Sequence, residues 1–108
     1  MPEFIFTDQN FKDEVLNYKG VVLVDFGAEY CPGCKIITPI MENLTKEYQN
    51  KIKIGKMDIA ENPKTTAEYG VMSIPVLIIF KEGKIVKQMM GVRPKLKIKE
   101  MIDAVLSK

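Results

Sequence analysis

Two kinds of hydrophobic pattern alternate along this chain. Val21–Gly27 and residues 76–80 are almost continuous apolar runs rich in β-branched side chains, which is typical of strands buried on both faces of a sheet. Shorter apolar stretches predict further strands at residues 4–6 and 52–57. A last strand is predicted over Lys84–Met90, after a Glu-Gly turn.

Four segments show the three- and four-residue spacing of helices. The first follows Thr7 and Asp8, which we expect to cap it. The second runs from Cys34 to about Tyr48, and its apolar positions are Ile36, Ile37, Ile40, Met41, Leu44 and Tyr48. A short third helix is predicted over residues 62–69 and a fourth over residues 94–107.

The resulting element order is β-α-β-α-β-α-β-β-α. The turn at residues 82–83 makes the last two strands antiparallel. The chain is therefore predicted to be α/β, with a mixed five-stranded sheet flanked by four helices on both faces. With 108 residues it has the size of a single domain, residues 1–108.

Composition narrows the class of protein. Apolar residues make up 46% and charged residues 28%, and the net charge is +2, as expected of a soluble globular protein without a nucleic-acid or membrane partner. The residues at the amino end lack the basic and apolar regions of a signal peptide. No apolar run approaches the roughly 20 residues of a membrane helix. We therefore expect a cytoplasmic location.

The scarce residues are more informative. The sequence contains no His, no Trp and only two Cys. The lack of His excludes histidine acid–base catalysis, Cys-His and Ser-His nucleophile pairs, and imidazole metal ligands. Two Cys cannot supply the usual four thiolates of a zinc or iron–sulfur site. No bound metal is expected.

Cys31 and Cys34 stand at the predicted junction between a strand and a helix. Backbone N–H groups and the helix dipole would lower the pKa of Cys31 and make it a nucleophile, while Cys34 keeps its proton longer. A structural staple is one alternative, although closing so short a ring contributes only about 2 kcal/mol. Half of a zinc site shared across a dimer is another. The junction favours a redox pair.

Asp25 is an acidic residue inside a strongly apolar strand. A buried carboxylate is costly unless it is paired or its pKa is raised. The alternative is a carboxylate that faces solvent at the end of the strand.

Several blocks of the sequence resemble the thioredoxin family over the whole length of the chain. They are residues 6–11, residues 22–35, Pro39, Asp58, Asn62-Pro63, residues 69–71, Ile74-Pro75 and Gly91. The resemblance implies a thioredoxin fold, reduction of protein disulfides, and no cofactor beyond a redox-active Cys31–Cys34 disulfide. It also implies disulfide-containing client proteins and a thioredoxin reductase, usually an NADPH-dependent flavoprotein, as partners of a monomer.

The resemblance assigns roles to individual residues. Cys31 would attack the client disulfide and Cys34 would resolve the mixed disulfide, with Asp25 as the base for Cys34 and Lys56 as its modulator. Pro75 would follow a cis peptide bond beside the cysteines, which would free the backbone of the preceding residue for an extended client segment. An apolar docking rim would consist of Tyr30, Pro32, Gly33, Ile59, Ile74, Gly91 and Val92.

The sequence departs from the family at the motif itself. The usual Gly-Pro between the cysteines is inverted to Pro32-Gly33, and we expect the Gly33 N–H to become an extra donor to Cys31, making the protein more oxidising. Gly27 and Tyr30 replace two usual Trp residues, which should loosen packing near the site.

Two other functions stay open on the sequence alone. A glutaredoxin-like or more oxidising thiol–disulfide oxidoreductase is one alternative. The presence of Asp25 and the lack of a Gly-Gly pair after Pro75 argue against it. The other is a binding or chaperone-like module that uses the apolar rim without turnover.

Overall fold

The protein is described by a computed structural model that covers residues 3–107. Met1 and Pro2, on which part of the signal-peptide argument rests, lie outside the described residues, as does Lys108. The strands are β1 (Phe4–Ile5), β2 (Val21–Gly27), β3 (Lys53–Asp58), β4 (Val76–Lys81) and β5 (Lys84–Met90).

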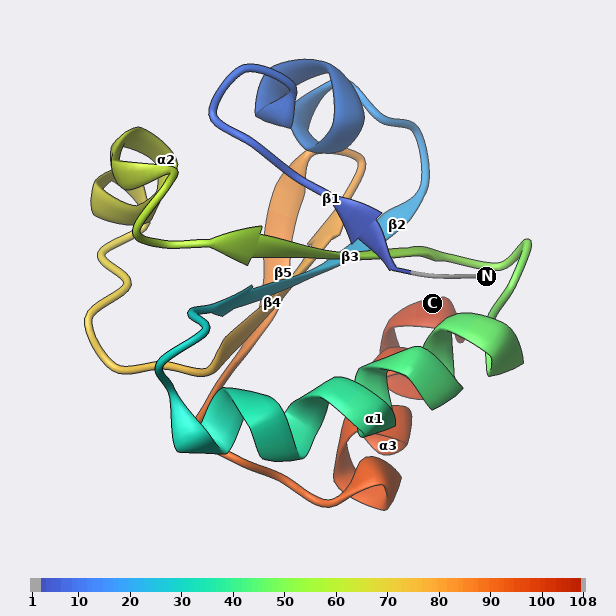
Figure 1. Cartoon of the computed structure of the whole chain (residues 1–108). Coiled ribbons are helices and arrows are strands. Elements are labelled where there is room, and N and C mark those ends of the chain that lie inside the picture. Colours follow the sequence, from blue (N-terminus) through green and yellow to red (C-terminus); the bar gives the residue numbers. More distant parts are fainter. Residues whose placement is uncertain (1–2, 108) are drawn as a thin grey trace.

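These strands form one sheet in the order β1-β3-β2-β4-β5. β3 runs parallel to both β1 and β2, whereas β4 is antiparallel to β2 and to β5 (Figure 1). The mixed five-stranded sheet predicted from the sequence is therefore confirmed.

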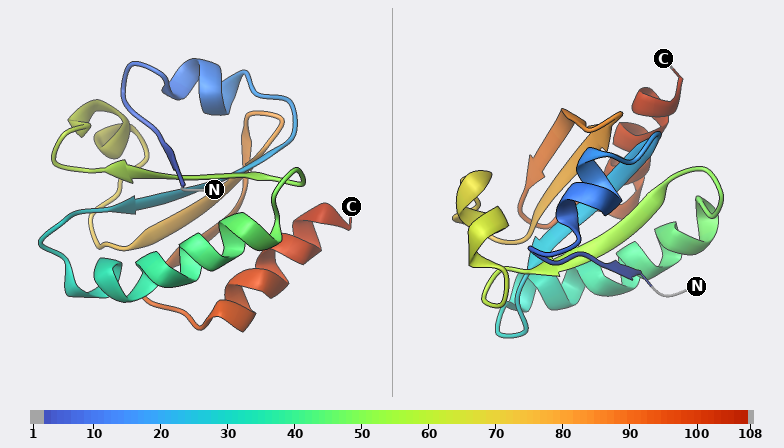
Figure 2. Two further views of the ribbon diagram at one scale, coloured as in Figure 1. Left: turned by 45° about the vertical axis from the view of Figure 1, so that its right-hand side comes forward. Right: turned by 90° about the horizontal axis from the view of Figure 1, so that it is seen from above.

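Helices cover both faces of the sheet, as predicted. The helices are η1 (Lys12–Leu16), a short π-helix, α1 (Pro32–Glu47), α2 (Pro63–Glu68) and α3 (Lys95–Leu106). Figures 1 and 2 show α1 and α3 side by side on one face, while η1 and α2 lie on the other. Among residues 3–107, no helix is both long and apolar enough to cross a membrane.

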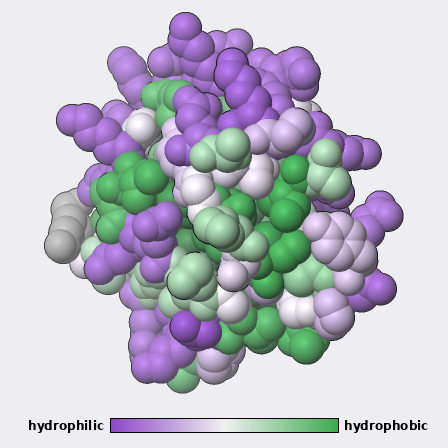
Figure 3. Space-filling view, turned by 90° about the vertical axis from the view of Figure 1, so that its left-hand side faces the viewer, coloured by the Kyte–Doolittle hydropathy of each residue, from purple (hydrophilic) through white to green (hydrophobic). Residues whose placement is uncertain are grey.

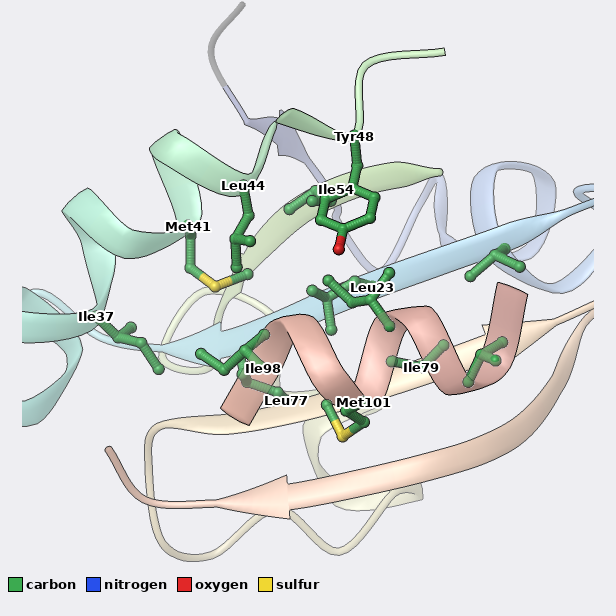
Figure 4. Close-up of a cluster of buried hydrophobic side chains, with 13 residues drawn as sticks. Leu23, Ile37, Met41, Leu44, Tyr48, Ile54, Leu77, Ile79, Ile98 and Met101 are labelled. Atoms are coloured by element: carbon green, nitrogen blue, oxygen red, sulfur yellow. The ribbon is translucent and has the colours of Figure 1, made fainter. Parts of the chain in front are cut away.

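The central strand β2 separates two hydrophobic clusters. Val21 and Leu23 pack under α1 and α3 (Figure 4), whereas Val22, Val24 and Phe26 pack under η1 and α2. Since successive side chains of a strand point to opposite faces, Asp25 lies on the same face as α1. Both sides of β2 are thus buried, which explains its nearly continuous apolar sequence.

The start of the first helix differs from the prediction. Thr7 Oγ1 accepts a hydrogen bond from the Asn10 N–H at 3.1 Å within the turn before η1, whose N-cap residue Phe11 receives no side-chain capping bond, so Thr7 does not cap the helix as predicted. The Asp8 carboxylate instead accepts bonds from the Lys64 and Thr65 N–H groups, at 3.2 and 2.9 Å. Asp8 therefore caps α2, across the fold, and the expectation that it caps the first helix was wrong.

Candidate active site

The loop after β2 delivers Cys31 to the start of α1. Cys31 is the N-cap residue, with extended backbone angles, and Pro32 occupies the first helical position. The fixed φ of proline suits that position, and its missing N–H would have had no partner there. The predicted strand-to-helix junction is thus confirmed.

Cys31 and Cys34 are joined by a disulfide, with their Cα atoms 5.2 Å apart. The Cys31 sulfur accepts a hydrogen bond from the Cys34 N–H at 3.1 Å. This is the bond that an N-cap side chain makes to the third helical residue. The expected extra donor was Gly33, but in this oxidised state the N–H group that contacts the Cys31 sulfur belongs to Cys34.

A second loop faces the disulfide. The Ile74–Pro75 peptide bond is cis, and the Ile74 carbonyl oxygen lies 3.9 Å from the Cys31 sulfur. Gly33 lies so close to this loop that a Cβ atom there would stand 3.2 Å from Pro75 Cδ and 3.1 Å from Val92 Cγ2. The Gly91 N–H donates to the Pro75 carbonyl at 2.8 Å. Residues far apart in the sequence therefore meet around Cys31.

Figure 3 shows hydrophobic side chains gathered in the middle of one face of the molecule, and the predicted rim residues differ in how far they are exposed. The Tyr30 side chain is 72% exposed and Val92 is 39% exposed. Ile74 is half-buried next to them, while Ile59 packs partly against the hydrophobic cluster under α2. The surface therefore combines one large exposed ring with smaller, partly buried side chains.

The sequence prediction missed two exposed apolar side chains. Met72 is 91% exposed and lies two residues before Ile74. Ile36 is 59% exposed, although its helical spacing had placed it with the core residues of α1. The sequence offered one signal for each exposed side chain. Each of these apolar residues lies close in the sequence to a residue of the predicted site.

Asp25 is buried on the α1 face of the sheet, beside Lys56 in the register of β2 and β3. Burial raises the pKa of Asp25 to about 7, and the positive charge of Lys56 acts in the opposite direction. Its Oδ1 has no hydrogen-bond partner. The Lys56 side chain is exposed. A carboxyl that titrates near neutrality can accept a proton in one state and return it in another.

A cavity of about 600 Å³ is lined in part by Cys34, and neither Ile74 nor Pro75 lines it. Its lining residues are Ile5, Asp25, Gly27, Ala28, Glu29, Cys34, Lys35, Thr38, Lys56, Met57, Asp58 and Glu61. A Cβ atom at Gly27 would lie 2.9 Å from the Cys34 sulfur and 4.0 Å from Asp25 Oδ1. The absence of a side chain at Gly27 therefore lets Cys34 approach closely, and Cys34 and Asp25 line the same cavity.

Glu3 is a second buried carboxyl, which the sequence prediction missed. Its residue is only 9% exposed, and its Oε2 has no hydrogen-bond partner. Burial, followed by the charge of Asp25, raises the pKa of Glu3 to about 7, while Lys56 lowers it. The available signal was weak, because a lone Glu before a two-residue edge strand is ordinarily a solvated residue.

The described residues contain no group of three or more His, Cys, Asp or Glu side chains that could hold a metal ion. The groups in these residues that can take part in a reaction are the Cys31–Cys34 disulfide and two buried carboxyls.

Comparison with known proteins places the geometry in a family. Residues 3–104 match the family model described as Thioredoxin. The chain is 46% identical to "Thioredoxin" of Buchnera aphidicola subsp. Acyrthosiphon pisum, over 90% of each chain. It is 44% identical to "Thioredoxin" of Bacillus subtilis, over 90% of this chain and 91% of the relative. The chain belongs to the thioredoxin family.

Thioredoxin-family proteins are thiol–disulfide oxidoreductases, and the Cys31–Cys34 disulfide is the redox-active group of this one. "Thioredoxin 2" of Chlorobaculum tepidum is a further relative, 45% identical over 90% of this chain and 89% of its own. The chain therefore has the thioredoxin fold and acts as a thioredoxin-type disulfide reductase.

Proposed function

We propose that this protein transfers two electrons to client disulfides by a two-step exchange in which Cys31 attacks and Cys34 resolves. The Cys31 thiolate attacks one client sulfur, the client S–S bond breaks, and the other client sulfur leaves as a thiolate that takes up a proton. The Cys34 thiol then loses its proton and attacks Cys31. The mixed disulfide breaks, the client dithiol is released, and the Cys31–Cys34 disulfide remains.

The position of Cys31 is the observation that carries this assignment. Its sulfur sits at the N-cap of a long helix and accepts an N–H bond there, an environment that stabilises a thiolate. Cys34 is one turn further into the helix and adjoins the cavity. The two thiols therefore differ in environment as an attacking and a resolving thiol should.

Asp25 is the proposed acceptor of the Cys34 proton. Its buried carboxyl lines the same cavity as Cys34, and its pKa of about 7 matches a proton that must be taken up and returned near neutral pH. The exposed Lys56 ammonium beside it favours the ionised carboxylate. We assign Lys56 the role of adjusting that proton affinity.

The client would bind across the apolar rim around Cys31. The Ile74 carbonyl borders the sulfur at 3.9 Å, so an extended client segment can pair with this backbone while its disulfide reaches Cys31. The flanking rim residues, with Met72 added to those predicted, supply apolar contact. The rim residues are Tyr30, Pro32, Gly33, Ile59, Ile74, Gly91, Val92 and Met72.

We further propose that the protein works as a cytoplasmic monomer of one domain, within an electron-transport chain that begins at NADPH. A flavoprotein thioredoxin reductase would return the Cys31–Cys34 disulfide to the dithiol. The support is the family, whose members include the bacterial thioredoxins of Buchnera and Bacillus.

Insulin reduction tests the assignment. With NADPH and a bacterial thioredoxin reductase, the wild type should reduce insulin, and Cys31→Ser should lose turnover completely. Cys34→Ser should instead accumulate a mixed disulfide, because the attacking thiol remains. Turnover by Cys31→Ser would contradict the role of Cys31. A wild type without insulin turnover would favour the binding module, and an active wild type that only reduced glutathione can regenerate would favour the glutaredoxin-like alternative.

Replacing the proposed base gives the sharpest test of Asp25. In single-turnover experiments at pH 7, Asp25→Asn should form the mixed disulfide at the wild-type rate but release the client roughly 100-fold more slowly, the lower end of the range for general-base catalysis. Equal release rates in both proteins would remove Asp25 from the mechanism.

A further inference from the structure

The proposed exchange uses one buried carboxyl, but the same side of the sheet holds two. Glu3 directly precedes β1, whose Ile5 is in register with Lys56 of β3, which in turn is in register with Asp25 of β2. Side chains alternate along a strand, and Phe6 belongs to the cluster under η1 and α2. Ile5 and Glu3, which lie two positions apart, are therefore both expected on the α1 face.

This edge of the sheet is held firmly. The Phe6 N–H donates to the Lys56 carbonyl at 2.9 Å, which extends the pairing of β1 with β3. Gly55 allows β1 to approach closely, since a Cβ atom there would meet the Phe4 carbonyl oxygen at 2.5 Å. Glu3 therefore directly precedes a strand that pairs closely with β3.

Each of the two carboxyls has an oxygen without a hydrogen-bond partner, Glu3 Oε2 and Asp25 Oδ1. An unsatisfied buried carboxylate oxygen is costly, and two like charges so placed oppose each other's ionisation. One lysine, Lys56, acts electrostatically on both. One positive charge can offset one carboxylate, so the pair is favoured with a single negative charge.

The surrounding charges come from every element packed against the pair. β2 contributes Asp25 and β3 contributes Lys56, while α1 contributes Glu42, whose negative charge acts weakly on Glu3. The cavity beside Asp25 is also lined by the charged residues Glu29, Lys35, Asp58 and Glu61. Glu42 is exposed, so water screens it far more than it screens the buried pair.

We propose that Glu3 is a positioning residue for thiol–disulfide exchange, which acts through Asp25 so that the two carboxyls take up and release protons as one unit beside Lys56. This inference rests on the proposed role of Asp25 as the base for Cys34. Glu3 itself touches neither the disulfide nor a client.

The direction of the effect follows from mutual repulsion. Ionisation of Glu3 disfavours ionisation of Asp25, so the pair releases its two protons in separate steps at different pH values. Gln resembles a permanently neutral Glu. In Glu3→Gln, Asp25 should therefore ionise in one step and at lower pH than in the wild type.

Carbon-13 NMR of the side-chain carboxyls tests the coupling directly, without any activity measurement. In the oxidised wild type, we expect the Asp25 signal to titrate over a broad pH range. In Glu3→Gln its midpoint should fall and its curve should narrow to a single-proton step. In Asp25→Asn the Glu3 midpoint should fall by the same amount, because coupling between two sites is reciprocal.

Glu42→Gln is the matched control, since it removes one negative charge from α1 at an exposed position. Its Asp25 curve should coincide with that of the wild type. Glu3→Asp should retain the broad titration, because it keeps the carboxyl. Coincident Asp25 curves in the wild type and Glu3→Gln would overturn the proposal, and if Glu3→Gln does not fold, an unmoved Glu3 curve in Asp25→Asn would do so.

Single-turnover kinetics separate the role of Glu3 from the proposed function. The acid limb of client release, measured between pH 5 and pH 9, should shift to lower pH in Glu3→Gln by the shift seen in the NMR curve. If Asp25→Asn releases client at the wild-type rate, the base role fails, and with it the link from Glu3 to catalysis. If Asp25→Asn is slow while the carboxyls titrate independently, only the role of Glu3 fails.

Discussion

At the scale of single residues, an energetically costly buried group lies at the active site. Asp25 lies in the middle of an apolar strand, with one unpartnered carboxylate oxygen and only an exposed lysine to offset its charge. A fold optimised for stability alone would place an apolar residue there. The carboxyl thus costs stability, and that cost depends on pH.

Asp25→Asn is therefore expected to stabilise the protein at high pH only. The folded state raises the pKa of Asp25 from 3.8 to about 7, so the unfolded chain loses this proton first as the pH rises. Wild-type stability should fall relative to the variant between about pH 4 and pH 7, and the difference should reach at most about 4 kcal/mol. Urea unfolding of both oxidised proteins at pH 4 and pH 8 measures it. A difference independent of pH would show that burial of the carboxylate is not its cause.

Residues also mark where sequence reasoning reached its limit. Cys31, Cys34 and Asp25 could be found because each breaks a local pattern: a cysteine pair at a junction and a charge in an apolar run. Glu3 breaks no pattern, because its burial depends on β1 packing at the edge of β3, far along the chain. Ile36 follows the helical pattern but faces solvent beside the site.

At the scale of elements, the helix α2 depends on a residue from another part of the chain. Its N-cap residue Asn62 makes no capping bond with its side chain, and Asp8 supplies the acceptors instead. The Asn62 side chain in return accepts a bond from the Asp8 N–H at 2.9 Å. The segment before η1 and the start of α2 are therefore locked together.

Asp8→Ala should loosen α2 more than its position in the sequence suggests. The variant leaves two N–H groups of a one-and-a-half-turn helix without protein acceptors, and we expect amide exchange in α2 to accelerate and the melting temperature to fall by a few degrees. The bonds from Thr65 lower the pKa of Asp8, so the loss should be present at neutral pH and vanish as the wild-type carboxyl is protonated in acid. Asp13→Ala, a change of the same type in η1, is the control, and an equal effect there would contradict the capping role.

Elements that are buried on both faces could be predicted from the sequence with correct limits. Val21–Gly27 is such a strand, because both of its sides need apolar residues. The short helices were less accessible. η1 forms a π-helix, and the cap of α2 comes from a residue more than fifty positions earlier, so neither feature leaves a local pattern.

At the scale of the whole molecule, the reactive disulfide lies at one end of the sheet while the two hydrophobic clusters lie between the sheet and its helices. Neither cysteine belongs to either cluster. The fold consequently supports the disulfide without relying on it.

The reduced protein should therefore fold to the same structure as the oxidised protein. The two cysteines are only three positions apart, so their bond restricts the unfolded chain little and should stabilise the fold by about 2 kcal/mol. Urea unfolding with and without a dithiol reductant measures the difference. A reduced protein that lacked a cooperative transition would show instead that the disulfide holds the fold together.

The whole sequence contains no Trp. The protein therefore does not fluoresce when it is excited at a wavelength that only indole absorbs. In a mixture with a reductase or a client, all fluorescence under this excitation comes from the partner. Binding and electron transfer can then be followed in unlabelled proteins, against a background to which this chain contributes nothing.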